Sequence, residues 1–193
     1  MEDPVQQAID ARLETAGTEL IKPDKAGFGL IEGDQPEFRS ARAAALYRYW
    51  ATKRADGKTQ RGDIEPAEIK ALLPYVLIVD LQENPFRIYY RLVGTAVAHF
   101  SGLDFTGYFL DELAFDICSV EDLTKAYRKV AETGKPGIGM AFTQITHHSA
   151  LDVEYLICPL FDAAGKVTQC LVLEDYVDKR GIDKTRLRLA RPA

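Results

Sequence analysis

The spacing of hydrophobic residues changes between helical and strand patterns along this chain, and the order of these patterns limits the folds that the chain can form. After a helical beginning come two β-rich runs, VLIVDL and RIYYRLV, which the loop QENPF separates as in a hairpin. Three helical patterns follow over residues 95–136, and three β-rich runs come after them: IGMAFTQIT, VEYLICPLF and VTQCLVLEDYV. Because the helices gather between the second and third strands, the order predicts an α+β fold. We expect a five-stranded antiparallel sheet with helices on one face, preceded by N-terminal helices.

Helical patterns at the start of the chain divide it into three parts. Asp3 and Pro4 suit the start of a short amphipathic helix. A second pattern, PEFRSARAAALYRYWATKR, has apolar residues at three-and-four spacing, and a third begins at Pro66 and ends at Pro74. We therefore expect an N-terminal amphipathic helix and connector over residues 1–36, a domain with its leading helices over residues 37–177, and a basic tail over residues 178–193.

Charge and composition exclude several classes of protein. The 193 residues carry a formal net charge of −5, which argues against a general nucleic-acid binder. The acidic N-terminus lacks the features of a signal peptide, and the longest apolar runs are far shorter than a bilayer span. The three cysteines form no CxxC pair, so we expect reduced thiols. These features predict a cytoplasmic protein with no membrane span.

The predicted order of elements is that of a PAS domain, and short motifs over residues 38–176 resemble a group of short bacterial proteins that carry one such domain. The motifs are a helix with Trp50, the run DIEPAEIKALLP, the strand end RLVGT, the pair Thr106-Gly107, and EYLICPLFDAAG. The resemblance implies a sensory or interaction module that signals through dimerisation. It also implies a pocket between the sheet and the helices, whose ligand in this group is unknown.

From the resemblance and the residues we expect a non-enzymatic sensory module that binds an unidentified small molecule and acts through protein contacts. The expected partners are a second copy of the chain, in a homodimer, and a signalling protein of unknown identity; the cofactor is also unknown. The pocket candidates combine aromatic bulk with a few polar tips. They are Tyr90, His99, Phe100, Tyr127, Phe142, Gln144 and Tyr155. The alternative is an interaction scaffold with a filled core and no ligand.

An enzyme is a further alternative, because RLVGTA matches the pyrophosphate-binding loop of acetyl-CoA-dependent N-acetyltransferases at Arg91, Gly94 and Ala96. The surrounding sequence favours a structural role, since a hydrophobic strand runs up to Gly94 and the next helix breaks after about two turns. We expect Gly94 to turn the strand into the helix and Thr95 to cap that helix. Arg91 would pair with a carboxylate such as Asp80 or Glu83.

The histidines give weak indications of a metal or haem site. His147 and His148 are adjacent, so a strand would point them to opposite faces, and a metal site would need Asp152 or Glu154 as well. His99 could ligate haem from the short helix, although a surface histidine is the simpler interpretation.

Other chemistry lacks its sequence context. Cys118 is not in the Asn-Cys-Arg setting of a flavin photoreceptor, and Cys158 and Cys170 suit packing positions in strands. The run KPGIGMAF lacks the Lys-Ser/Thr of a phosphate loop, and no Gly-x-Ser-x-Gly elbow occurs. The basic tail is either a solvated end or a docking segment for an acidic partner or a membrane surface.

Overall fold

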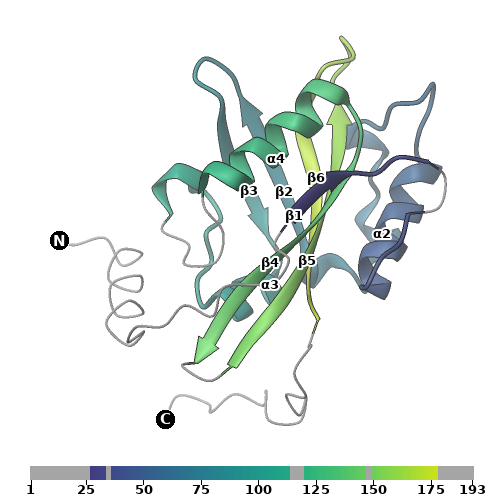
Figure 1. Ribbon diagram of the computed structural model, residues 1–193. Coiled ribbons are helices and arrows are strands. Elements are labelled where there is room, and N and C mark those ends of the chain that lie inside the picture. The colour runs from purple at the N-terminus through teal and green to yellow at the C-terminus, as the bar shows by residue number, and fades with distance from the viewer. Residues whose placement is uncertain (1–26, 34–35, 114–119, 147–148, 178–193) are drawn as a thin grey trace.

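The computed structural model describes residues 27–33, 36–113, 120–146 and 149–177, which form a six-stranded antiparallel sheet with helices against both faces (Figure 1). The strand order across the sheet is β1-β4-β5-β6-β2-β3. The strands are β1 (Gly27–Leu30), β2 (Val76–Gln82), β3 (Arg87–Val93), β4 (Gly137–Thr146), β5 (Ser149–Phe161) and β6 (Val167–Val177). The predicted first helix and the predicted basic tail lie outside the described residues.

In the described residues, three α-helices and four short 3-10 helices accompany the sheet. The α-helices are α2 (Ala41–Thr52), α3 (Thr95–Ser101) and α4 (Val120–Thr133). The 3-10 helices are η1 (Arg61–Asp63), η2 (Pro66–Ile69), η3 (Leu73–Tyr75) and η4 (Leu110–Glu112). Within the described ranges, no helix has the length and apolar character needed to cross a bilayer.

The predicted α+β class and the order of the five predicted strands are confirmed, and the sheet has one strand more. The segment Gly27–Leu30, which we assigned to a connector, forms β1 and pairs antiparallel with β4. The predicted helix after Pro66 is replaced by η2 and η3, whose bonds span three residues, as from the Tyr75 N–H to the Leu72 carbonyl (2.8 Å). Pro74 has no backbone N–H to donate, so an α-helix cannot continue through it toward β2.

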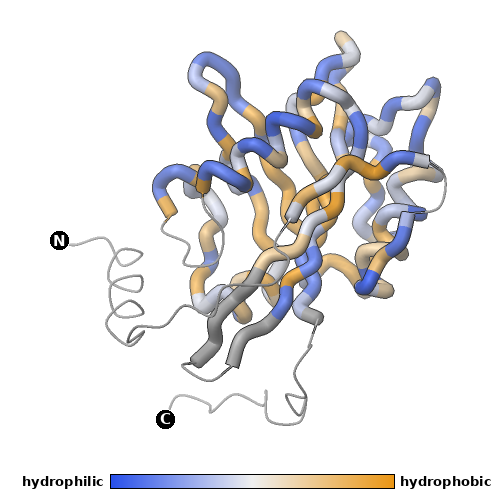
Figure 2. Tube along the Cα trace, viewed as in Figure 1, coloured by the Kyte–Doolittle hydropathy of each residue, from blue (hydrophilic) through white to orange (hydrophobic). Residues whose placement is uncertain are grey.

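Residues of β5 alternate between two hydrophobic cores, one on each face of the sheet. Tyr155 and Ile157 belong to the core covered by α3 and α4, which we call the α4 face. Leu156 and Cys158 belong to the core covered by α2, which we call the α2 face. Figure 2 shows the apolar residues concentrated in the strands, whereas α4 and the outer loops are largely hydrophilic. The helices between the second and third predicted strands thus cover one face, as predicted, and the leading helix α2 covers the other, because the strands alternate apolar residues to both sides.

Two buried carboxylates of the sheet hold the N-terminus of α2 on its face. The Glu154 carboxylate accepts hydrogen bonds from the backbone N–H groups of Arg39 (2.9 Å) and Ser40 (2.5 Å). The Asp175 carboxylate accepts a hydrogen bond from the Ser40 hydroxyl (2.6 Å) and forms an ion pair with Arg42 (3.0 Å). Ser40 in turn caps the helix by accepting from the Ala43 N–H. The free N–H groups of the helix and the buried charges of the sheet therefore satisfy one another.

The tryptophan of α2 anchors the helix at its other end. Trp50 is buried, and its indole Nε1–H donates to the backbone carbonyl of Pro159 on β5 (3.1 Å). Pro159 is directly opposite Cys170 in the β5–β6 pairing. Contacts at both ends therefore fix the position of α2 along β5 and β6.

The turn RLVGTA connects β3 to α3, and Arg91 forms the predicted pair with Asp80 on β2. Our expectation that Thr95 caps α3 is wrong, because Gly94 occupies the N-cap position, with an ordinary φ of −65°. Glycine is needed there for another reason. A Cβ on Gly94 would lie within 3.0 Å of the backbone of Pro74, so only glycine allows this close approach.

The Thr-Gly pair covers the outer edge of β3. The Thr106 hydroxyl accepts from the Val93 N–H (3.1 Å), and the Gly107 N–H donates to the Tyr90 carbonyl (2.8 Å). Gly107 has a φ of +91°, a conformation that residues with a side chain rarely adopt. The pair therefore satisfies backbone groups that an edge strand would otherwise leave open.

Replacement of Glu154 by glutamine tests the attachment of α2. In Glu154→Gln the side-chain NH2 group would face one of the two backbone N–H groups. That backbone N–H would then have no acceptor. We expect a loss of about 1–3 kcal/mol in the free energy of unfolding, measured by urea denaturation. The exposed neighbour Glu37 provides a matched control, and Glu37→Gln should change stability by less than about 0.5 kcal/mol. Equal effects of the two substitutions would contradict this role for Glu154.

Candidate functional site

Polar side chains gather on the α4 face, where a packed core would ordinarily be apolar. Tyr90 comes from β3, Tyr127 from α4, Tyr155 from β5, and Glu174 and Tyr176 from β6. We call these five residues the tyrosine–glutamate cluster. Tyr155 lies directly opposite Glu174 in the β5–β6 register, and Glu174 and Tyr176 are two positions apart on one strand. The period of the strands therefore turns these groups toward the same side of the sheet.

The cluster extends from the core toward solvent. Tyr90 and Tyr127 are each 3% exposed, and Tyr155 is 7% exposed. Glu174 and Tyr176 are only partly buried. Glu174 therefore lies at the outer end of the cluster, where solvent reaches it.

The electrostatics of the cluster single out Glu174. Burial raises the pKa of its carboxyl to about 7, although a hydrogen bond with Tyr176 acts in the opposite direction. Burial also raises the pKa of Tyr127 well above its ordinary value, and the neighbouring Tyr90, Cys170 and Glu174 contribute to that rise. At neutral pH Tyr127 is thus an uncharged phenol, while Glu174 is divided between its two protonation states.

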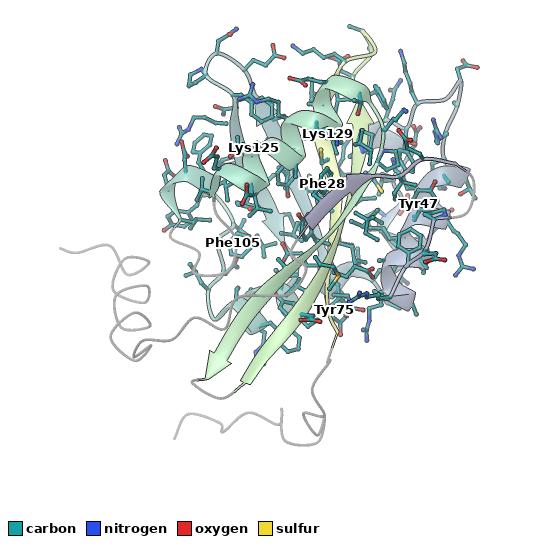
Figure 3. The ribbon with its side chains drawn as sticks, viewed as in Figure 1. Phe28, Tyr47, Tyr75, Phe105, Lys125 and Lys129 are labelled. Atoms are coloured by element: carbon teal, nitrogen blue, oxygen red, sulfur yellow. The ribbon has the colours of Figure 1, made fainter. Side chains whose placement is uncertain are left out.

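Two glycines of β4 leave room for the aromatic rings beside the cluster. A Cβ on Gly139 would lie within 3.0 Å of the Tyr155 ring, and one on Gly137 would lie equally close to Phe28 of β1. The rings of Phe28 and Tyr155 stack with centroids 6.1 Å apart and planes 6° apart. Figure 3 labels Phe28 on β1. The run KPGIGMAF therefore forms a surface on which two rings lie.

Helix α3 contacts the cluster through Phe100. The Phe100 ring stacks on Tyr176 with centroids 4.2 Å apart and an interplanar angle of 27°. His99 is exposed, and its ring meets Phe100 at an angle of 77°. Phe100 thus lies beside the site, and the exposed His99 ring packs against Phe100.

Of the seven residues expected to line a pocket, the structure brings four together: Tyr90, Phe100, Tyr127 and Tyr155. Phe142 and Gln144 lie on β4 opposite Asp152 and Ala150, but their side chains are outside the described set. We did not single out Glu174 or Tyr176 from the sequence. The signal was present, because in VTQCLVLEDYV the alternation that buries Cys170 and Val172 on the α4 face continues to Glu174 and Tyr176.

The cysteines that the structure describes are packing residues, as the sequence indicated. Cys158 and Cys170 are fully buried, and burial raises the pKa of both thiols. No group of three or more metal-binding side chains occurs among the described residues. Cys118, His147 and His148 lie outside them.

A separate cleft of about 420 Å³ opens at the other end of β6, between the β2–β3 loop and α4. Of its charged groups, Lys166, Glu83 and Arg128 have partners within the protein. Lys166 pairs with Glu83 (2.6 Å), and the Arg128 guanidinium lies 4.4 Å from the centre of the Phe86 ring. The cleft is therefore a less suitable candidate for recognition of a charged ligand than the tyrosine–glutamate cluster.

Comparison with known proteins identifies one family model, described as a PAS domain, which matches residues 38–173. No curated protein matches the sequence. Among solved structures, an RNA-binding light-oxygen-voltage receptor is 14% identical and covers 79% of this chain, with a TM-score of 0.46. The chain spans only 39% of that receptor's length.

Two further structures match most of their own length. A light-oxygen-voltage domain studied with a flavin analogue is 16% identical, and the alignment covers 63% of this chain and 90% of that one, with a TM-score of 0.40. The light state of the aureochrome1 light-oxygen-voltage domain is 14% identical, with coverages of 62% and 91% and a TM-score of 0.36.

Substitution of Gly139 tests the packing of Tyr155. In Gly139→Ala the added methyl group would displace the Tyr155 ring, and we expect a loss of about 1–3 kcal/mol in stability, measured by thermal or urea denaturation. Gly29 on β1 is the matched control, because a Cβ there meets nothing within 4 Å. Gly29→Ala should leave stability unchanged or slightly higher. A Gly139→Ala protein as stable as Gly29→Ala would show that the ring does not occupy this position.

The pKa of Glu174 predicts how stability depends on pH. The folded-state pKa lies above the ordinary 4.5, so ionisation opposes folding, and stability falls as the pH rises from about 4.5 to about 7. Glu174→Gln removes this cost. We expect the variant to exceed the wild type by up to about 3 kcal/mol at pH 8 and to match it near pH 4, measured by urea denaturation at both values. A difference that does not change with pH would contradict the shifted pKa.

Proposed function

Because the chain belongs to the PAS domain family, as the match over residues 38–173 shows, we propose that it is a sensory module that binds a small molecule at the tyrosine–glutamate cluster. The resemblance drawn from Trp50, RLVGT and Thr106-Gly107 is thereby confirmed, and a sensory character follows from the family. The ligand site, the protein contacts and the absence of catalysis are parts of the proposal.

Glu174 is the observation that carries the proposal. A carboxyl that faces the core raises the free energy of the folded state, by about 3 kcal/mol at neutral pH from its pKa shift, where an apolar residue would add to the packing. A titratable group with a pKa near physiological pH, beside other polar groups, is a typical feature of functional sites. Its partial exposure gives a ligand access to the cluster.

Helix α3 offers a way to convert ligand binding into altered contacts. Phe100 stacks on Tyr176, so a ligand that moves Tyr176 changes the packing of α3. Helix α3 also contacts η3, and there Leu73 is 36% exposed; Leu92, at the end of β3, is 46% exposed. We propose that apolar surface of this kind forms contacts with a second copy of the chain or with a signalling protein in the cytoplasm.

A second candidate, the scaffold without a ligand, is favoured by the close packing of the inner tyrosines. Tyr90, Tyr127 and Tyr155 together fill much of the α4 face. In that case Glu174 would have no ligand, and the module would act through its surface alone.

A thermal-shift screen of the full chain against a library of metabolites separates the two candidates. We expect at least one compound to raise the melting temperature by several degrees, because a ligand at 100 times its Kd stabilises a protein by about 2.7 kcal/mol. The shift should fall by at least half in Glu174→Gln and persist in Glu121→Gln, a variant of an exposed glutamate on α4. If no compound gives a shift that depends on Glu174, the scaffold is the better description.

A further inference from the structure

We infer that the ligand of the tyrosine–glutamate cluster is a small organic cation, a protonated amine or a quaternary ammonium on an apolar or aromatic body. This inference rests on the proposed function and specifies its ligand class. The family match ends at residue 173, so it does not include Glu174 and Tyr176, on which this inference depends.

The charges that face Glu174 favour a cation. The side chains that share the α4 face with Glu174 are phenols, a thiol and an aromatic ring. They are Tyr90 on β3, Phe100 on α3, Tyr127 on α4, Tyr155 on β5, and Cys170 and Tyr176 on β6. Among the described residues, the pKa of Glu174 responds to burial and to Tyr176 and to no lysine, arginine or histidine. An anionic ligand would meet the ionised carboxylate with no described cation to offset it.

The basic side chains of α3 and α4 have other partners or are exposed to solvent. Lys125 pairs with Glu121 (2.6 Å) on the outer side of α4, and Arg128 stacks on Phe86 at the far end of the sheet. His99 is exposed on α3, and Lys129 is exposed on α4. A positive charge supplied by a ligand would therefore complement the cluster, whereas a negative one would not.

Aromatic rings next to a carboxylate suit a cation for a second reason. The faces of tyrosine and phenylalanine rings carry negative electrostatic potential and attract ammonium groups, most strongly where water is excluded. The chain uses this interaction on its own surface, where Arg87 lies 3.6 Å from the centre of the Phe109 ring and Arg42 lies 4.2 Å from that of Tyr75. In the cluster the protein supplies rings and a carboxyl, and the ligand would supply the cation.

Burial of Glu174 couples the binding of a cation to pH. The carboxyl has a pKa of about 7 in the free protein, and a cation next to it stabilises the ionised form. Binding therefore releases a proton below pH 7. Affinity for a cation should fall roughly tenfold between pH 8 and pH 6, and a neutral ligand should show no such loss.

The experiment compares matched pairs of probes with the full chain, by isothermal titration calorimetry at pH 8 and pH 6. The first pair is choline and its uncharged isostere 3,3-dimethylbutan-1-ol. The second is protonated 2-phenylethylamine and uncharged 2-phenylethanol, with 3-phenylpropanoate as the anion of similar shape. We expect the cation of each pair to bind at least roughly tenfold more tightly than its partner at pH 8, and this preference to shrink at pH 6.

Three variants assign the preference to Glu174. Glu174→Gln should remove both the preference for cations and its dependence on pH, whereas Glu174→Asp keeps the charge and should retain both in part. Glu121→Gln should bind as the wild type does. Circular dichroism and the melting temperature establish that each variant is folded before its titration.

The outcomes separate the ligand class from the proposed function. Neutral or anionic probes that bind as tightly as the cations, or a preference that survives in Glu174→Gln, would overturn the inference. If compounds from the metabolite screen bind in a Glu174-dependent way but none is a cation, the inference fails and the proposed function stands. If neither probes nor library compounds bind, both fail.

Discussion

The fold depends on the way in which buried carboxylates of the sheet meet the N-terminus of α2. Glu154 and Asp175 would destabilise the α2 face if they lacked partners, because a buried charge without hydrogen bonds is costly. Backbone N–H groups at Arg39 and Ser40, together with the Ser40 hydroxyl and Arg42, supply those partners. The same contacts fix where α2 lies on β5 and β6. Helix α2 of the same chain therefore covers this face of the sheet.

Acidic residues on the two faces of the sheet have different partners, and this difference locates the candidate site. On β6, Asp175 points to the α2 face and is ion-paired, while the adjacent Glu174 points to the α4 face among phenols. Adjacent residues of one strand therefore have opposite roles, because strand geometry sends them to opposite environments. A carboxylate with strong partners stabilises the fold. One with weak partners in a partly open setting remains available to a ligand.

The spacing of hydrophobic residues predicts most of the fold, and the features that it does not predict have physical causes. The long runs of β2 to β6 and the stripe of α4 predict their elements because each buries many apolar residues. GFGL is too short and too rich in glycine to predict β1, which is stabilised by its pairing with β4 and by the stacking of Phe28. Gly94 is required by the nearby Pro74 backbone, which no local pattern reveals. The position of Glu174 on the α4 face is predictable only when the inward–outward alternation of β6 residues is extended from Cys170 and Val172 to residue 174.

The glycines of β4 link the candidate site to the beginning of the described chain. Tyr155 lies flat over Gly139, and its ring stacks on Phe28, which lies over Gly137. Strand β1 has four residues and one neighbouring strand, so it is among the least firmly held parts of the sheet. A displacement of the Tyr155 ring would therefore disturb the packing of β1 as well as that of the candidate site.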